Sequence, residues 1–284
     1  MEVIKKVSLI TTLYNEADNI FNFLESYKKQ TKYADEFIIV DGGSIDGTID
    51  IIEQYAKDNK ELNIQLIVDK TCSKKYTAGP IAKGRNVAIE NAKHDYIAVT
   101  DAGCILDEHW FEEITKLFED DSIDVVSGWY KANIVNEFQT VYADIYLPTL
   151  NNFDPKSFLP SSRSLAFKKN CWGKVGGYPT DSMTAEDTKF DLDLKKMGCS
   201  FVFNEKAIVY WNCPKSYQEA IDKAYYYAVG DGQKRLYFKK FLMRTFLMLL
   251  PVNIFLDKKR RENFKLSYGV MLNYQYGYLK GLLS

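Results

Sequence analysis

The sequence has no excess of charge of either sign and no cysteine spacing typical of a metal or disulfide scaffold. Its 284 residues include 37 basic and 38 acidic side chains, so no overall attraction to nucleic acid is predicted. Five cysteines stand far apart, which argues against a zinc site and a disulfide framework. The first residues, MEVIKKVSLITT, contain no long apolar core like that of a secretory signal. We therefore expect a cytoplasmic protein that binds no nucleic acid.

Two common phosphate-binding signatures are also missing. No G-x-G-x-x-G follows the first apolar run, and no G-x-x-x-x-G-K-[ST] occurs anywhere in the chain, so the usual evidence for dinucleotide or P-loop binding is absent. Acids and hydroxyls stand instead where the predicted strands end, at Thr12, Glu16, Asp41 and Asp101. Such groups suit a nucleobase edge, a ribose and a metal ion.

Apolar runs alternate with helical patterns over the first 120 residues. The predicted strands are 7–13, 36–40, 62–68 and 95–100, and the predicted helices are 17–27, 46–55 and 78–92. This alternation is typical of an α/β protein with a Rossmann-like, mostly parallel sheet flanked by helices. Asp101 would then lie at the carboxyl end of a central strand, where open α/β sheets bind their ligands. A helical pattern is predicted to begin at Asp107.

The alternation is lost after residue 121. Predicted there are a strand at 124–130, a helix at 138–150, a loop at 151–160, a strand at 164–167 and a helix at 185–197. Two short strands, at 201–203 and 207–211, are predicted as antiparallel additions to the sheet. The residues from 214 to 284 form a helical, aromatic-rich C-terminal extension, whose first helix is predicted to be interrupted by a turn at 230–233.

The extension contains an apolar stretch at 241–256, followed by a basic cluster from Lys258 to Arg261. The uncharged run is shorter than the about 20 residues that a membrane-spanning helix needs. One interpretation is peripheral contact of residues 241–261 with the anionic inner membrane face. The other is a helix pair that packs on the preceding domain or on a second subunit of a homo-oligomer. The sequence leaves both open.

Five motifs occur in a recognisable order. They are the first strand with T-L-Y-N-E, then V-D-G-G-S-I-D-G-T at Asp41, G-R-N-V-A at Arg85, V-T-D-A-G at Asp101, and G-G-Y followed by Glu186-Asp187. Together they resemble the family 2 inverting glycosyltransferases, which have the GT-A fold. The resemblance implies a catalytic domain over residues 1–213, with a nucleotide-binding half to about residue 120 and an acceptor-side half after it.

The resemblance also implies a donor site and a metal. The residues that would bind the nucleotide sugar are Thr12, Tyr14, Glu16, Asp41, Gly43, Arg85, Asp101 and Ala102. Asp101 would hold Mg²⁺ or Mn²⁺ against the diphosphate, which is chemistry that a hard oxygen ligand supports. Gly103 stands where the family carries a second metal-binding carboxylate, so the sequence leaves metal dependence open.

On the acceptor side, the resemblance implies that Asp187 is the general base and that Glu186 orients the helix or the acceptor. The segment Gln233-Lys234-Arg235-Leu236-Tyr237 lacks the Q-x-x-R-W of processive members, which favours transfer of one sugar. We predict an inverting, non-processive hexosyltransferase. Its donor would be a nucleotide-diphosphate sugar, with UDP favoured, and its acceptor a carbohydrate or a lipid-linked molecule, as in surface-polysaccharide biosynthesis.

Other interpretations of the same residues stay open. Asp41 also suits a turn before two glycines, Arg85 suits a surface salt bridge, and Glu186-Asp187 suits the acidic first turn of a helix. A sugar nucleotidyltransferase would share the sheet, but it should carry a Gly-rich basic loop after the first strand. A non-catalytic sugar- or lipid-binding scaffold would explain Gly103 but not the retained acidic pair.

Overall fold

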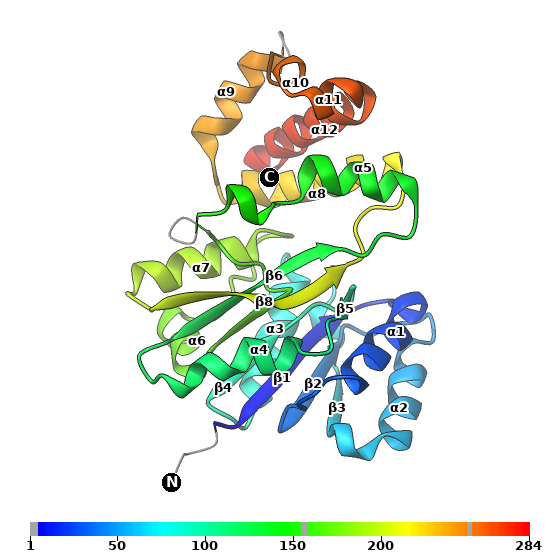
Figure 1. The fold of residues 1–284 in the computed structure, drawn as a ribbon, viewed down its shortest axis with the longest axis vertical. Helices are drawn as coiled ribbons and strands as arrows, with labels where there is room; N and C mark the ends of the chain where they lie inside the picture. The colour runs from blue at the N-terminus through cyan, green and yellow to red at the C-terminus, as the bar shows by residue number, and fades with distance from the viewer. Residues whose placement is uncertain (1–4, 155–157, 249–251) are drawn as a thin grey trace. The chain divides into compact units, whose positions relative to one another are not determined.

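A computed structural model describes residues 5–154, 158–248 and 252–284, and the chain divides into two compact units (Figure 1). Unit 1 takes in the chain up to Asn133 together with Phe153–Asp181 and Glu186–Asn212. Unit 2 consists of Ile134–Asn152, Ser182–Ala185 and Cys213–Ser284. The predicted domain boundary at residue 213 stays a prediction.

Unit 1 is built on an eight-stranded sheet with the order β3-β2-β1-β4-β7-β6-β8-β5. Its strands are β1 Val7–Leu13, β2 Glu36–Asp41, β3 Ile64–Val68, β4 Tyr96–Val99, β5 Cys104–Leu106, β6 Val125–Ala132, β7 Leu165–Lys168 and β8 Phe201–Trp211. Strands β1 to β4 are parallel to one another, as predicted. The strand order changes direction at β1 and β4, which is the position where open α/β sheets form a ligand site at their carboxyl ends.

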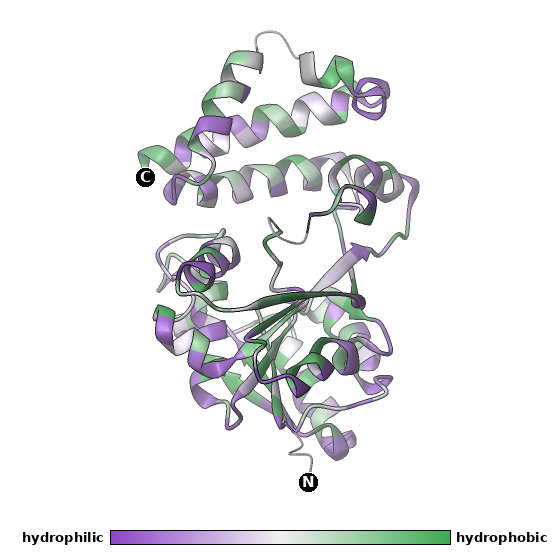
Figure 2. Ribbon diagram, turned by 60° about the vertical axis from the view of Figure 1, so that its left-hand side comes forward, coloured by the Kyte–Doolittle hydropathy of each residue, from purple (hydrophilic) through white to green (hydrophobic). Residues whose placement is uncertain are grey.

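Helices cover both faces of this sheet. Those of unit 1 are α1 Ala17–Lys28, α2 Thr48–Asp58, α3 Pro80–Asn91, α4 Trp110–Thr115, α6 Lys169–Val175 and α7 Glu186–Lys196. Alternate residues of a strand point to opposite faces, so Ile38 and Val40 of β2 join a core with α3, α6 and α7, whereas Phe37 packs on Phe23 and Tyr27 of α1. Figure 2 shows the strands as mostly hydrophobic and the helices as mixed.

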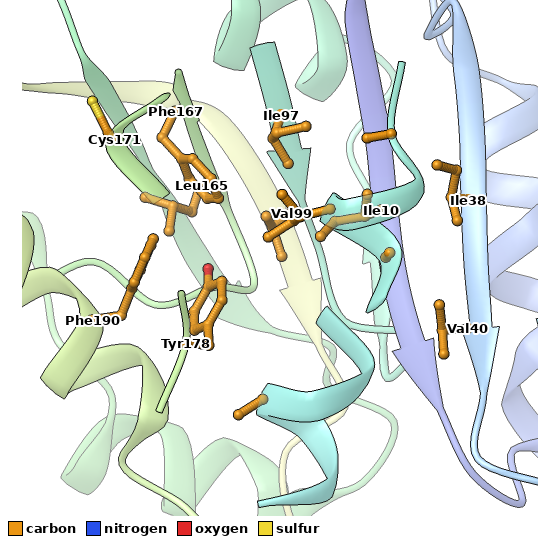
Figure 3. Packing of buried hydrophobic residues seen from close by; sticks show 14 of the residues in the cluster. Ile10, Ile38, Val40, Ile97, Val99, Leu165, Phe167, Cys171, Tyr178 and Phe190 are labelled. Atoms are coloured by element: carbon orange, nitrogen blue, oxygen red, sulfur yellow. The ribbon is translucent and has the colours of Figure 1, made fainter. Parts of the chain in front are cut away.

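One aromatic stack fixes α7 against the sheet. The rings of Tyr178 and Phe190 lie 4.0 Å apart and parallel to within 23°, and Phe190 also contacts Phe167 of β7 at 5.3 Å. Figure 3 shows these rings beside Leu165. All three aromatic rings are fully buried or nearly so. The position of the first turn of α7 therefore depends on core packing and not only on its local sequence.

The far half of the sheet differs from the prediction in three ways. Residues 201–211 form one continuous strand, β8, which runs parallel to β6 and antiparallel to the unpredicted strand β5. Because β5 takes up residues 104–106, α4 begins at Trp110 and not at Asp107. The prediction divided β8 into strands at 201–203 and 207–211 because the polar segment Asn204-Glu205-Lys206 lies between them. In the structure this segment lies at a register shift in the β6–β8 pairing.

Unit 2 consists of helices. They are α5 Glu137–Tyr146, α8 Tyr217–Gln233, α9 Phe238–Met248, α10 Val252–Leu256, α11 Lys258–Glu262 and α12 Phe264–Leu283. Short 3-10 turns in the described part of the two units are Lys60–Leu62, Lys70–Cys72, Lys116–Glu119 and Leu150–Asn152. The turn predicted at 230–233 is wrong, because α8 continues through it to Gln233. Glycine lowers helix propensity, but here it permits close packing of α8 on α12.

The contact between α8 and α12 relies on residues without side chains. A Cβ atom on Gly281 of α12 would lie 2.1 Å from the backbone oxygen of Val229, and one on Gly232 of α8 would lie 2.3 Å from that of Tyr278. The phenol of Tyr274 also donates to Asp231 Oδ2 at 2.5 Å. Gly232 in α8 therefore marks a helix–helix interface and not a chain reversal.

The apolar stretch that was predicted at 241–256 is only partly described, because residues 249–251 lie outside the described ranges. Within the described part, no helix combines the length and the apolar character that crossing a membrane requires. Phe246 of α9 is 75% exposed and Leu256 of α10 is 81% exposed. These two helices thus present large apolar side chains to their surroundings, and α10 contacts the basic helix α11.

We predict that Gly281→Ala lowers the free energy of unfolding by about 1–3 kcal/mol, because the added methyl group would meet the backbone of α8, which cannot rotate away. The matched control is Gly173→Ala in α6, where a Cβ meets nothing within 4 Å and helix propensity alone favours alanine. Urea unfolding followed by circular dichroism measures both. Equal stability of the two variants would show that the α8–α12 contact is looser than described.

Candidate active site

Three polar residues predicted for the donor site lie at the carboxyl ends of neighbouring strands. Thr12 is near the end of β1, Asp41 ends β2, and Asp101 follows β4 by two residues. Strand β1 pairs with β2 on one side and with β4 on the other, so the three residues share one edge of the sheet. The sequence predicted this arrangement from strand ends alone.

Asp41 combines a turn-forming role with an unused acceptor. Its Oδ1 accepts hydrogen bonds from the backbone N–H groups of Gly43 at 2.7 Å and Ser44 at 2.6 Å, and Gly43 has a left-handed φ of +88°, which glycine adopts most readily. The side chain is fully buried, and Oδ2 has no hydrogen-bond partner among the described residues. A buried acceptor without a partner is costly, so Oδ2 indicates a place for a ligand N–H.

The other N-terminal candidates lie around this turn. A Cβ atom on Gly84 would be 2.0 Å from Thr12 Oγ1, so α3 packs directly on the end of β1. Tyr14 is 49% exposed, which leaves its ring accessible to a ligand. Glu16 precedes α1, where its carboxylate accepts from Asn19 at 3.0 Å.

Arg85 is the side chain that joins the two halves of the predicted site. One terminal nitrogen donates to Asp101 Oδ1 and the other to Glu186 Oε1, each at 2.8 Å, while the guanidinium carbon lies 5.3 Å from the centre of the Tyr178 ring. The side chain is 3% exposed, so it is not a surface salt bridge. Burial would lower the pKa of Arg85, but the carboxylates of Asp101 and Glu186 outweigh it and raise the pKa.

The acidic pair lies in the first turn of α7. Burial and the neighbouring charge of Asp187 raise the pKa of Glu186 to about 7, against the opposing effect of Arg85. Asp187 is only partly buried, and its Oδ1 accepts from the backbone N–H of Thr188 at 2.9 Å. Glu186 is therefore paired with Arg85, and Asp187 is the more accessible carboxylate of the two.

A third carboxyl group lies on the same helix and was not predicted as a site residue. Asp191 lies one turn after Asp187, is fully buried, and has no hydrogen-bond partner for either oxygen among the described residues. Burial, reinforced by the charge of Asp187, raises the pKa of Asp191 well above its ordinary value. Helical spacing could have placed Asp191 on the same face as Asp187, but nothing in the sequence showed that this face is buried.

Arg163 is the residue that sequence reasoning missed altogether. Its Nε lies 3.9 Å from Asp101 Oδ2, on the opposite oxygen from the one that Arg85 contacts. It stands in the segment before β7, where no motif or spacing identified it. Contact with Asp101 arises only because β7 pairs directly with β4.

A divalent cation fits this site only in part. Asp101 offers a hard carboxylate with a side chain 32% exposed, Ala102 is buried, and Gly103 offers no ligand. Further oxygen ligands would have to come from a bound diphosphate. Elsewhere in the described ranges, the one close group of three ligand-type residues is Asp124, Cys171 and Cys199. There burial and Cys199 raise the pKa of Cys171 to about 12, and thiols are poor ligands for a hard cation such as Mg²⁺.

Comparison with known proteins identifies the family to which this fold belongs. The family model described as "Glycosyl transferase family 2" matches residues 8–178. The chain belongs to this family, and it is a glycosyltransferase with the GT-A fold.

Two related proteins are similar to this chain at low sequence identity. Glycosyltransferase AglE of Haloferax volcanii is 26% identical over 265 residues, which cover 89% of this chain and 82% of AglE. Poly-beta-1,6-N-acetyl-D-glucosamine synthase of Staphylococcus epidermidis is 23% identical over 75% of this chain and 51% of the synthase. The chain thus spans most of AglE but only about half of the synthase.

Two solved structures share the fold. Mannosyltransferase PcManGT from Pyrobaculum calidifontis, in complex with GDP-Man and Mn²⁺, has a TM-score of 0.68 and 17% identity, over 96% of this chain and 87% of that chain. S. aureus TarS 1-349 in complex with UDP has a TM-score of 0.57 and 18% identity, over 96% and 90%. At such identities the likeness shows the fold alone.

We predict that Asp191→Asn changes how stability depends on pH. A carboxyl group whose pKa is raised by folding binds more protons in the folded state, so its contribution to stability falls as the pH rises above the unfolded-state pKa of about 4. The wild type should therefore lose stability relative to Asp191→Asn between pH 4 and pH 8, with the closest agreement at the acidic end. Thermal unfolding across this range measures the difference. Parallel curves would mean that Asp191 is ionised in the folded protein.

Proposed function

We propose that this protein is an inverting, non-processive glycosyltransferase that moves one sugar from a UDP-sugar to an acceptor hydroxyl. The observation that carries the proposal is the double contact of Arg85, at 2.8 Å to Asp101 after β4 and at 2.8 Å to Glu186 at the start of α7. One buried guanidinium thus ties the predicted donor residues to the predicted acceptor residues. Asp187 follows Glu186 in the first turn of α7, and its charge acts on Arg85.

The free oxygen of Asp41 supports a uracil base. Oδ1 already accepts two backbone N–H groups, which leaves Oδ2 as a single acceptor. Uracil presents one ring N–H to such an oxygen, whereas guanine presents a ring N–H and an amino group, which pair best with both oxygens of a carboxylate. Because Asp41 is fully buried, side chains at the strand ends must move slightly to admit the ring. Thr12 and the exposed ring of Tyr14 would line the same end of the sheet.

Asp101, with Ala102 beside it, would face the ribose and the diphosphate. A Mg²⁺ or Mn²⁺ ion held by Asp101 and the diphosphate oxygens would supply positive charge to the leaving nucleotide. The carboxylate is oriented by Arg85 from one side, so its position does not depend on the ligand. Preorganised charge of this kind is what a displacement at an anomeric carbon requires.

Asp187 would act as the general base. It takes the proton from the acceptor hydroxyl while that oxygen forms its bond to the anomeric carbon, and the bond to the nucleotide oxygen breaks on the opposite face of the sugar. This single in-line step inverts the anomeric centre. Glu186 is unsuited to the role, because Arg85 holds its carboxylate at 2.8 Å. Burial and the charge of Asp187 raise the pKa of Glu186 to about 7, which favours its protonated form more than in an ordinary glutamate.

The acceptor is proposed to be a carbohydrate or a lipid-linked sugar. The segment 233–237 still lacks the processive motif, although it follows a continuous helix and not a turn. Unit 2 adds a feature that fits a lipid-linked acceptor: α9 and α10 expose Leu242, Met243, Phe246, Phe255 and Leu256. Helix α11, which contacts α10, carries Lys258, Lys259, Arg260 and Arg261. Apolar side chains next to a basic cluster favour an anionic lipid surface.

We predict that Asp187→Asn lowers kcat by about 10²- to 10⁴-fold while UDP binding is retained, because the amide cannot accept a proton. Turnover is measured as release of UDP from a panel of UDP-sugars with extracted lipid-linked and soluble acceptors. Asp193→Asn on the same helix is the matched control, because its carboxylate is partly exposed and paired with Lys189. It should keep wild-type turnover, and an unchanged kcat in Asp187→Asn would remove Asp187 from the chemistry.

Nucleotide binding tests the same proposal independently of turnover. Thermal unfolding of the wild type with UDP, GDP, CDP and dTDP, each with Mn²⁺ and with EDTA, should show the largest stabilisation by UDP. Stabilisation by GDP alone would overturn the uracil assignment. No stabilisation by any nucleotide would overturn the transferase proposal and favour a non-catalytic scaffold.

We also predict that the full chain sediments with vesicles that contain anionic phospholipid, and less so at high salt. The double variant Phe246→Glu, Leu256→Glu should lose this binding, because both side chains are highly exposed and apolar. Met197→Glu, at an exposed apolar position of unit 1, should bind as the wild type does. Equal sedimentation of all three proteins would contradict a membrane role for α9 and α10.

A further inference from the structure

Arg163 is held in one orientation by three neighbours. Its guanidinium carbon lies 4.4 Å from the centre of the Trp211 ring and 5.2 Å from that of Tyr130, and Nη1 donates to Ser161 Oγ at 2.8 Å. Trp211 ends β8 and Tyr130 lies in β6, so both rings belong to the sheet. The side chain is 15% exposed. An arginine held between aromatic rings presents a fixed, planar set of N–H donors.

This fixed cation faces the residue that would hold the donor's metal ion. Asp101 lies between two guanidinium groups, with Arg85 at 2.8 Å from Oδ1 and Arg163 at 3.9 Å from Oδ2. Arg85 has a second carboxylate partner in Glu186. Arg163 thus brings a second guanidinium group to the end of β4.

The backbone does not require a glycine at position 103. A Cβ atom on Gly103 would meet nothing within 4 Å, and its φ lies outside the left-handed region. Space and conformation thus permit an aspartate, which would place a second negative charge beside Asp101. Neither packing nor backbone geometry explains the glycine, whereas a site that already contains a fixed cation has less need of a second metal ligand.

We infer that Arg163 binds the diphosphate of the nucleotide-sugar donor and stabilises the charge that develops on it. This inference rests on the proposed function. As the bond between the anomeric carbon and the β-phosphate oxygen breaks, its electron pair stays on that oxygen, and the N–H groups of Arg163 donate to the diphosphate. The proton of the acceptor hydroxyl goes to Asp187. Charged hydrogen bonds from a guanidinium to phosphate are among the strongest in proteins, and Arg163 shares the work of any metal ion bound by Asp101.

A purely structural role for Arg163 makes a different prediction. If Arg163 only holds the segment before β7, its loss should weaken every ligand of the site or destabilise the fold. If it binds diphosphate, its loss should weaken UDP and spare uridine, which has the same base and ribose but no phosphate. The ratio of the two dissociation constants therefore separates the roles.

The experiment is isothermal titration of the full chain with UDP, UMP and uridine, for the wild type, Arg163→Gln and Arg163→Lys. We expect Arg163→Gln to raise the Kd of UDP by about tenfold or more, to raise that of UMP less and to leave that of uridine unchanged. Arg163→Lys should lie between, since it keeps the charge but not the fork. An equal loss for uridine and UDP, or no loss for UDP, would overturn the inference. Circular dichroism and thermal unfolding confirm that each variant is folded.

Gly103→Asp gives a second test that leaves Arg163 in place. The added carboxylate should weaken UDP binding in EDTA, because it competes for Arg163, and should restore binding when Mn²⁺ is present. Unchanged UDP binding in EDTA would count against Arg163 as the main cation of the site. Failure of the proposed function looks different, because the wild type itself would then bind neither UDP nor uridine.

Discussion

The buried ion-pair network of Arg85 is the interaction on which the rest of the site depends. Its guanidinium is removed from water, and two carboxylates from different parts of the chain compensate for the lost hydration. Leaving one charge of a buried pair without its partner typically destabilises a protein by about 3–5 kcal/mol. The packing of Gly84 on Thr12 and of Tyr178 on Phe190 places the two ends of this network. The geometry of the site therefore depends on the packing of the core in this protein.

The network also distributes charge among the acidic residues of α7. Arg85 lies between Glu186 and Asp101 and offsets part of their charge, while burial favours the neutral form of Asp191. Three carboxyl groups can then lie within little more than one helical turn without mutual repulsion that would open the helix. Asp187, the most exposed of the three, is the one for which a negative charge is least costly.

Two arginines from different parts of the chain supply positive charge beside Asp101. Arg85 comes from a helix within the parallel half of the sheet, and Arg163 comes from the mixed half, where β7 runs antiparallel to β4. The second half of the sheet thus contributes to the donor site as well as to the acceptor side. A boundary between nucleotide-binding and acceptor-binding halves at about residue 120 would divide this cluster, because Asp101 contacts residues from both sides of it.

The sequence by itself determined the parallel half of the sheet, the order of the strand-end acids and the family, because each depends on patterns within a few residues: strand periodicity, turn residues and motifs. It also predicted Asp41 as a turn residue and as an acceptor. In the structure Oδ1 accepts the hydrogen bonds of the turn, and Oδ2 has no partner among the described residues. Only the tertiary structure decided the pairing of β8 with β6, the helical state of Gly230 and Gly232, and the burial of Asp191. Contact of Arg163 with Asp101 belongs to the same group. These features depend on residues far apart in the chain, whose proximity follows from strand order and helix packing and leaves no local signal.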